Sequence, residues 1–565
     1  MSSTALEAVK ISGRMQAALA AGIFVLALLL AAYTQNAWED WYITYRASQN
    51  LAAGEGLVFQ PGERVHSFTS PLGVLIPAGI AAAVGPATDV GVVLWIFRVV
   101  CALVLAGTLV VLARLGVRLE LAFWPMLLLL GAFCLDLKTV LFSVNGMETA
   151  YMLAGVALTL LAFRDLSRRR FWQLGVAWAL LMWVRPDGCV YIGALSLGLL
   201  LFGWRNAHIQ SRAELLRCLV LAGLVTTVLY LPWFLWAWWF YGSPVPHTIL
   251  AKGSMHDAAP WANRLIDMLR FPVISLYVPV SLDAMYLPPE AVAFGGWHPA
   301  VLWVSKLLSW IAAFYWLMPR SDAWSRGVSF GLFLLNLYFC FVMNTLYPWY
   351  IPPGTMLTTL VLALILQRAL AFFASRENRP GPLMLRGAVV AFLVYLGGLF
   401  AAGAYHTHWR QFLIEDGLRR ELGVWLNENS PTGQETVFIE CLGYVGYFSQ
   451  LKMLDWPGLS SPEVVAARKK HQTEKWETLI RELQPDWVVL RDHEADFISS
   501  RDPGLLQGPY REVKRFDREP DVEALPWMPG RMYFILDDTF VVYQRAGEVA
   551  PPVPPPSSAD GSAGG

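Results

Sequence analysis

The sequence is poor in charge and in cysteine, and both shortages exclude classes of protein. Charged residues make up only 15% of the 565 residues and the formal net charge is zero, so no overall field attracts nucleic acid. Of the six cysteines, five lie in apolar runs without metal-ligand spacing, and only Cys441 lies in the last third of the chain. A disulfide framework in that last third is therefore excluded.

Two motifs of common membrane machines are also absent. The chain has no Gly-x-x-x-x-Gly-Lys-[Ser/Thr] loop to hold nucleotide phosphates and no His-Glu-x-x-His pair to hold zinc. These absences argue against an ATP-driven pump and against a common membrane hydrolase, and they leave a transporter open.

What the sequence has instead is apolar residues, which make up 56% of it, in runs long enough to cross a bilayer. A hydrocarbon core of about 30 Å needs roughly 20 apolar residues per helix. We therefore predict a polytopic α-helical membrane protein with about eleven transmembrane helices. They are expected at residues 15–33, 91–113, 121–135, 147–163, 172–183, 189–202, 215–240, 301–317, 328–344, 355–373 and 387–405.

The basic residues between these runs predict the topology. If the N-terminus is cytoplasmic, every arginine-rich loop falls on the cytoplasmic side, as the positive-inside rule requires. An odd number of helices then places the chain after residue 405 on the outer side. Two long loops also face outward, at residues 36–90 and 241–298. The first contains the apolar run Pro71–Val84, which is short for a span and is expected to form an interfacial or re-entrant helix.

The pattern changes after the membrane domain, which is expected at residues 1–405. Short strand-like runs such as 436–440, 487–490 and 540–544 alternate with amphipathic stretches such as 461–470 and 473–483. This alternation predicts an extracytoplasmic α/β domain at residues 406–548. Residues 549–565 are rich in Pro, Ser and Gly and are expected to form a disordered tail.

Adjacent carboxylates open the first outer loop. Glu39 and Asp40 directly follow the first apolar run, and Arg46 lies six residues beyond Asp40. One carboxylate could serve as a general base that takes a proton from an attacking hydroxyl. A solvated helix cap explains the same pattern.

Several stretches resemble a known family. They are residues 39–69 (EDWYITYRASQNLAAGEGLVFQPGERVHSFT), Asn145-Gly146-Met147-Glu148-Thr149-Ala150, Arg185-Pro186-Asp187-Gly188, Tyr241-Gly242, Pro246-His247-Thr248 and Ala251-Lys252. The first resembles the first external loop of GT-C membrane glycosyltransferases, in particular the branch that contains the mycobacterial terminal β-1,2-arabinofuranosyltransferase. The branch commonly has two aspartates where this chain has Glu39 and Asp40, and asparagine where it has His247.

The resemblance implies an inverting glycosyltransferase of a bacterial plasma membrane. It would move a sugar, with arabinofuranose as one candidate, from a polyprenyl-phosphate donor to a cell-envelope glycan or protein acceptor on the outer face. Asp40 would be the base, because its distance from Arg46 is similar to that in oligosaccharyltransferase catalytic subunits. Glu39 would orient Asp40 or share a divalent cation with it; no other cofactor is implied.

Further polar residues are candidates for binding the donor phosphate or the substrate. Arg98 lies within a predicted span, where a grip on phosphate or snorkelling would each explain its position. Arg185 could bind phosphate or simply pair with Asp187. Lys252 and His247 could stabilise the leaving phosphate or contact the acceptor, or they could be ordinary loop residues. Glu148 could contact substrate or cap the helix that follows it.

Two other functions fit the sequence less well. A transporter or flippase of lipid-linked intermediates would also need many helices and intramembrane cations, but no inverted repeat is visible. A non-catalytic membrane scaffold stays open because fold does not settle function.

Overall fold

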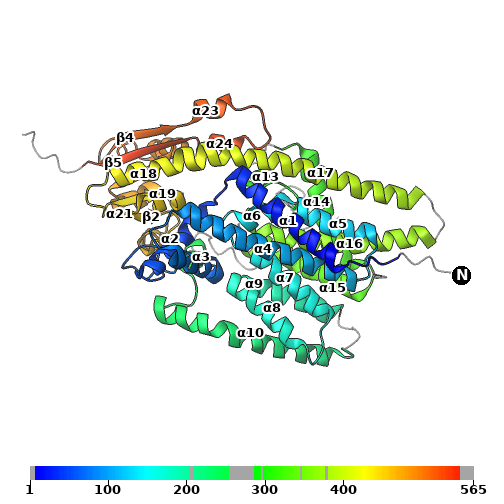
Figure 1. Cartoon of the computed structure of the whole chain (residues 1–565). Coiled ribbons are helices and arrows are strands. Elements are labelled where there is room, and N and C mark those ends of the chain that lie inside the picture. The colour runs from blue at the N-terminus through cyan, green and yellow to red at the C-terminus, as the bar shows by residue number, and fades with distance from the viewer. Residues whose placement is uncertain are drawn as a thin grey trace, which may run out of the picture.

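The structure, a computed structural model, describes residues 7–203, 209–253, 285–293, 297–319, 321–343, 347–375 and 380–546. A long helical bundle fills one end and a small five-stranded sheet lies at the other (Figure 1). The predicted disordered tail at 549–565 and much of the second outer loop lie outside the described residues.

The helical part contains most of the elements of the fold. Its helices are α1 (Gly13–Thr34), α2 (Glu39–Ala53), α3 (Pro71–Val84), α4 (Val90–Arg118), α5 (Phe123–Leu135), α6 (Leu137–Val144), α7 (Thr149–Arg164), α8 (Phe171–Val184), α9 (Gly188–Leu201), α10 (Arg212–Tyr241), α11 (His247–Gly253), α13 (Pro289–Ala293), α14 (Pro299–Phe314), η2 (Tyr315–Leu317), α15 (Ala323–Tyr338), η3 (Phe339–Met343), η4 (Pro348–Tyr350), α16 (Ile351–Ser375) and α17 (Pro380–Arg410).

Within the described ranges, six helices are long and apolar enough to cross a membrane, and a seventh span results if α5 and α6, bent by 47°, count as one. The predicted number of eleven is therefore not confirmed. The difference lies in helices of 13 to 16 residues, namely α5, α7, α8, α9 and α15, which are shorter than the roughly 20 residues that a straight span needs.

The external helices begin and end where the sequence supplies caps. α3 spans the residues predicted for it: the Ser70 hydroxyl accepts a hydrogen bond from the Gly73 N–H, and Pro71 occupies the first turn. α2 carries Glu39 and Asp40 in its first turn, where carboxylates are favoured by the helix dipole. It ends at Gly54, whose φ of 87° suits glycine.

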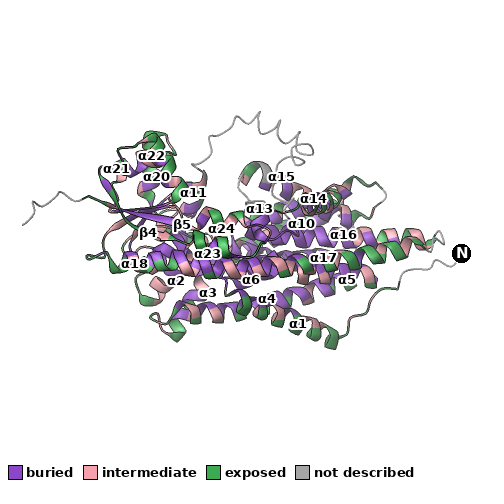
Figure 2. Ribbon diagram, turned by 90° about the horizontal axis from the view of Figure 1, so that it is seen from above, coloured by how far each residue is buried: buried purple, intermediate pink, exposed green. Residues whose placement is uncertain are grey.

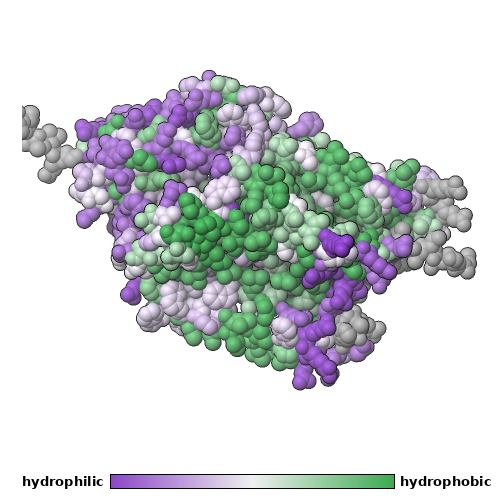
Figure 3. All heavy atoms as spheres, in the orientation of Figure 1, coloured by the Kyte–Doolittle hydropathy of each residue, from purple (hydrophilic) through white to green (hydrophobic). Residues whose placement is uncertain are grey.

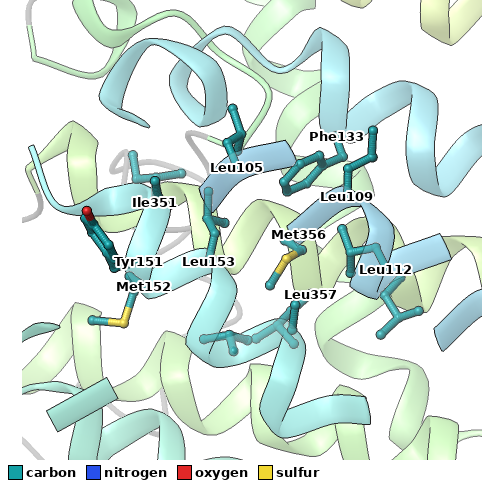
Figure 4. Close-up of a cluster of buried hydrophobic side chains, with 14 of the residues drawn as sticks. Leu105, Leu109, Leu112, Phe133, Tyr151, Met152, Leu153, Ile351, Met356 and Leu357 are labelled. Carbon is teal, nitrogen blue, oxygen red and sulfur yellow. The ribbon is translucent and has the colours of Figure 1, made fainter. Parts of the chain in front are cut away.

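The bundle is largely apolar both in its core and on its exterior. Side chains of α4, α7 and α16 meet in its core, among them Leu105, Leu109, Leu153, Met356 and Leu357 (Figure 4). Apolar side chains also cover much of the helical surface, whereas hydrophilic residues gather over the sheet end (Figure 3). An exterior of this kind requires lipid as its solvent, because a soluble protein rarely exposes such a large apolar area.

The sheet end is an α/β layer. Its elements are η5 (Gln411–Arg420), α18 (Glu421–Glu428), β1 (Thr436–Ile439), α19 (Leu442–Ser449), β2 (Lys452–Asp455), α20 (Pro462–His471), α21 (Trp476–Leu483), β3 (Trp487–Arg491), α22 (Asp492–Arg501), β4 (Tyr510–Asp517), α23 (Glu519–Ala524), α24 (Met532–Asp537) and β5 (Thr539–Arg545). The strand order is β2-β1-β3-β5-β4, with β1 parallel to β2 and β3 and the other pairs antiparallel. The three predicted strands correspond to β1, β3 and β5.

No linker separates the bundle from the sheet end. The predicted boundary at residue 405 falls inside α17, which continues through the π-helical segment η5 into α18, so that one helical run extends over Pro380–Glu428. The chain therefore enters the α/β layer through a helix that belongs to the bundle.

Close packing of α9 on α15 depends on glycine. A Cβ on Gly198 would lie much closer to the Gly327 carbonyl oxygen than van der Waals contact allows, whereas a Cβ on Gly193, in the same helix, would meet nothing within 4 Å. Gly198→Ala is expected to lower the thermal midpoint of the protein in detergent, because forcing the helices apart costs about 1–3 kcal/mol. Gly193→Ala is the control. Equal midpoints for the two variants would contradict the packing described here.

Candidate active site

The helix α2 is fixed against the bundle by the Asn145–Ala150 segment. The Trp38 N–H donates to the Asn145 carbonyl at 2.9 Å. Trp41 stacks on Phe97, with ring centroids 5.4 Å apart, and its ring also covers Gly146, where a Cβ would clash. Gly146 has a φ of 99° and leaves room for this ring. The segment that resembles the family motif therefore sets where Asp40 stands.

Asp40 is half-buried and its carboxylate forms no hydrogen bond or ion pair with any residue that the structure describes. The charges that influence it most strongly are those of Lys252 and Arg185. Burial raises the pKa of Asp40 above its ordinary value of 3.8, and the two cations partly offset that rise. A carboxylate of this kind is available to accept a proton.

Lys252, on α11, is the cation whose charge acts most strongly on Asp40. Its ammonium lies over the ring of Tyr347, 4.5 Å from the centroid, and forms no salt bridge in the described part of the chain. Burial lowers the pKa of Lys252, an effect that Asp40 opposes and Arg185 strengthens. Its charge is thus not neutralised by a contacting carboxylate.

Arg185 is held much more firmly. Its guanidinium lies 3.1 Å from Asp187 and 3.4 Å from Glu148, and it stacks on Tyr350 at 3.7 Å from the ring centroid. The predicted pairing of Arg185 with Asp187 is therefore present, and Glu148 joins it. Five of the predicted site residues come together in one cluster: Asp40, Glu148, Arg185, Asp187 and Lys252.

A cavity of about 340 Å³ lies against this cluster. Its polar lining includes Thr69, Arg185, Asp187, Thr248, Lys252, Tyr347 and Tyr350. The Oδ2 atom of Asp187 and the Oγ1 atom of Thr248 are buried and form no hydrogen bond with the described residues. A ligand rich in hydroxyl groups would satisfy both atoms.

Three predicted residues lie outside the cluster. The Arg46 guanidinium donates to the carbonyls of Gly446, Gln450 and Leu451, and the Arg98 guanidinium donates to those of Gln35, Asn36 and Val144. Both arginines are 2% exposed, so Arg98 does not snorkel, and the guanidinium group of each is engaged by backbone carbonyls. His247 lies near Asp455 and Gly458 of the sheet end.

Glu39 faces away from Asp40, toward the sheet end. Its two carboxylate oxygens accept hydrogen bonds from the Gly443 N–H at 2.6 Å and from Arg419 at 2.9 Å. A divalent cation between Glu39 and Asp40 does not fit this geometry, because both oxygens of Glu39 are already engaged. Among the described residues there is also no group of three or more metal-ligating side chains.

The sequence interpretation missed the aromatic wall of the cavity. Tyr347 and Tyr350 are not among the predicted site residues, but each lies against a cation of the cluster. Thr69, the last residue of the first loop motif, also lines the cavity. The topology carried a signal for the tyrosines, because it placed residues 347–350 at the outer end of a span, on the side of the first loop.

Comparison with known proteins gives the following. Residues 405–543 match a family described as a domain of unknown function (DUF8728). No curated protein matches the sequence. Among solved structures, the chain is similar to ArnT from Cupriavidus metallidurans bound to undecaprenyl phosphate, with 12% identity and a TM-score of 0.49 over 96% of this chain and 100% of that one.

The chain is also similar to the arabinofuranosyltransferase AftD from mycobacteria, with 14% identity and a TM-score of 0.43; it covers 40% of that longer protein with 96% of its own length. Both TM-scores are below 0.5. The function is therefore inferred below from the residues of the site.

The mutual influence of Asp40 and Lys252 can be tested without any substrate. We expect acetylation of Lys252 by acetic anhydride, followed by mass spectrometry over a pH series, to show a midpoint below the ordinary lysine pKa of 10.5. Asp40→Asn should move the midpoint lower still, because the carboxylate that favours the ammonium is lost. Exposed Lys514 is the internal control, and a Lys252 midpoint at or above that of Lys514 would refute the arrangement.

Proposed function

We propose that this protein is a membrane glycosyltransferase that uses a polyprenyl-phosphate sugar as donor and Asp40 as general base. The observation that carries the proposal is the Asp40 carboxylate, which is free of hydrogen bonds among the described residues and under the charges of Lys252 and Arg185, two cations that line a cavity of about 340 Å³. A base, a cation and a pocket for a polar group are the parts that this transfer needs.

Asp40 takes the proton of the acceptor hydroxyl. The hydroxyl oxygen then forms a bond to the anomeric carbon, the bond between that carbon and the phosphate oxygen breaks, and the polyprenyl phosphate leaves with the electron pair. Glu148 and Asp187 are both paired with Arg185, so Asp40 is the carboxylate of the cluster that has no ion pair in the described part of the chain. A single unpaired carboxylate supports one direct displacement, which inverts the anomeric centre.

Lys252 stabilises the negative charge that develops on the leaving phosphate. Arg185 is already matched by two carboxylates, whereas Lys252 lies over the face of Tyr347 and forms no salt bridge with the residues that the structure describes. An ammonium that is not neutralised gives more stabilisation to an arriving phosphate than one already paired. Asp187 and Thr248, with their unpartnered oxygens, are placed to bind hydroxyl groups of the sugar.

The cavity is suited to a donor that is part lipid. Its polar side holds Arg185 and Lys252, and its other side is formed by Tyr338, Val342 and Met343 at the end of α15 and in η3. Val342 is 61% exposed on the apolar surface of the bundle. A phosphate at the polar side could thus keep its polyprenyl chain in the bilayer.

The location of the reaction follows from the loops. The cluster, the first loop and the α/β layer lie at the same end of the bundle (Figures 1 and 2). The arginine-rich loops support a cytoplasmic N-terminus, which places this end outside a bacterial plasma membrane. The acceptor is then a glycan or protein of the cell envelope, and arabinofuranose is the first sugar to test, because the loop motif resembles that branch.

Purified protein in nanodiscs, offered a panel of polyprenyl-phosphate sugars and glycan acceptors, tests the proposal. Asp40→Asn is expected to lower turnover by about 10²- to 10⁴-fold, the usual contribution of a general base. Glu55→Gln, at an exposed carboxylate just beyond α2, should keep wild-type turnover. Absence of transfer from every donor by well-folded wild-type protein would instead favour the transporter or the scaffold.

The pH dependence of kcat/KM gives a second test. Since burial raises the pKa of Asp40, the acidic limb should lie above the ordinary aspartate value of 3.8. Lys252 lowers that pKa, so Lys252→Met should move the limb to higher pH as well as reduce the rate. Lys514→Met, at an exposed site on β4, should leave the limb where it is. A limb that Lys252→Met does not move would separate Lys252 from the base.

A further inference from the structure

We propose that the α/β layer at residues 405–543, which matches a domain of unknown function, is a brace that sets the distance between Asp40 and Lys252, with Arg468 as its positioning residue for Lys252. This inference rests on the proposed function for its catalytic meaning. The bracing itself is a structural statement that can be tested without activity.

Arg468, on α20, spans the two parts of the molecule. Its Nη1 atom donates to the Pro457 carbonyl at 2.7 Å and to the Ala251 carbonyl at 3.2 Å. Its Nε and Nη2 atoms donate to Glu474 at 2.7 Å and 2.6 Å. The residue is 3% exposed. A buried guanidinium whose Nε, Nη1 and Nη2 atoms all donate hydrogen bonds is held firmly, and this one binds the backbone of α11.

The grip falls on the residue next to Lys252. The short helix α11 is held near its start by the His247 N–H, which donates to the His66 carbonyl of the first outer loop at 2.9 Å. Near its end it is held by the bond from Arg468 to Ala251. Figure 2 shows α11 beside α20. The position of the Lys252 ammonium therefore depends on a contact with the α/β layer.

The same layer also holds the helix that carries Asp40. The Gly443 N–H and Arg419 bind Glu39, the neighbour of Asp40, at 2.6 Å and 2.9 Å. Further along α2, Arg46 donates to the carbonyl of Gly446 at 2.7 Å. One rigid layer thus binds both the helix of the base and the helix of the cation.

The chemistry of Arg468 argues for positioning and against a direct electrostatic effect. Its charge is matched by Glu474 in a two-point contact, so the pair adds little net charge at Asp40. A lysine could pair with Glu474 but could not also keep the planar set of donors that reaches Pro457 and Ala251. The arginine is needed because it joins three partners at once.

The first experiment uses the full-length protein in nanodiscs. Arg468→Met is expected to lower kcat by about 10- to 100-fold, the loss typical of a misplaced catalytic group, and to move the acidic limb of kcat/KM to higher pH, because Lys252 moves away from Asp40. Arg481→Met, which removes an exposed ion pair with Asp502 in the same layer, is the matched control. In a Lys252→Met background, Arg468→Met should change kcat less than twofold, because residues that act through one another are not additive.

The second experiment needs no substrate. Spin labels at Ala53→Cys, at the end of α2, and at Leu250→Cys, on the exposed side of α11, report the distance between the two helices in a Cys189→Ser background. The distance distribution should broaden in Arg468→Met and in the milder Glu474→Gln, and stay narrow in Arg481→Met. Glu474→Gln keeps the test valid if Arg468→Met does not fold.

The outcomes separate the two proposals. A broadened distribution together with wild-type protein that transfers no sugar would overturn the proposed function and leave the brace intact. Narrow distributions in both variants, or wild-type kcat and pH profile in Arg468→Met of an active enzyme, would overturn the brace.

Discussion

The burial of the Arg46 guanidinium constrains the whole site. A buried charge is costly unless most of its donors are satisfied, and the two terminal nitrogens of Arg46 bind carbonyls of Gly446, Gln450 and Leu451 together with the amide oxygen of Gln60, while its Nε has no partner among the described residues. Separation of the α/β layer from the bundle would remove three of these four partners at once. Separating the layer from α2 would therefore cost free energy, because the buried Arg46 guanidinium would lose most of its hydrogen bonds.

The two cations of the cluster beside α2 are held in different ways. Arg185 is confined by Glu148, Asp187 and the ring of Tyr350, which makes it a fixed part of the wall. Lys252 rests on the face of Tyr347 and on a short helix that is held at both ends. A fixed arginine can shape the wall of a pocket. A lysine without a salt bridge among the described residues can pair with an anionic group that enters the pocket, and these two roles suit the two residue types.

Much of this arrangement could be read from the sequence, where the signal was local. The run Pro71–Val84 is a helix because Ser70, Pro71 and Gly85 mark its ends. The pairing of Arg185 with Asp187 followed from a separation of two residues. The proximity of Asp40, Lys252 and Glu148 was expected only through the family resemblance.

The contacts that the sequence did not reveal are those with partners far along the chain. Arg46 bonds to a carbonyl 400 residues away, so no local pattern distinguishes it from a substrate-binding arginine. The contacts of Arg98 could not be read for the same reason, since the carbonyls that it binds belong to the ends of other helices. The number of spans was uncertain because helices of 13 to 16 residues look apolar whether or not they cross the bilayer.

The helical run Pro380–Glu428 gives the protein a mechanical property. A helix embedded in lipid tilts when the thickness of the bilayer does not match its apolar length. No loop residues separate α17 from the α/β layer. A tilt of α17 therefore rotates the layer together with the helix. The composition of the surrounding membrane thereby becomes a variable that acts on the geometry of the cluster around Asp40 and Lys252.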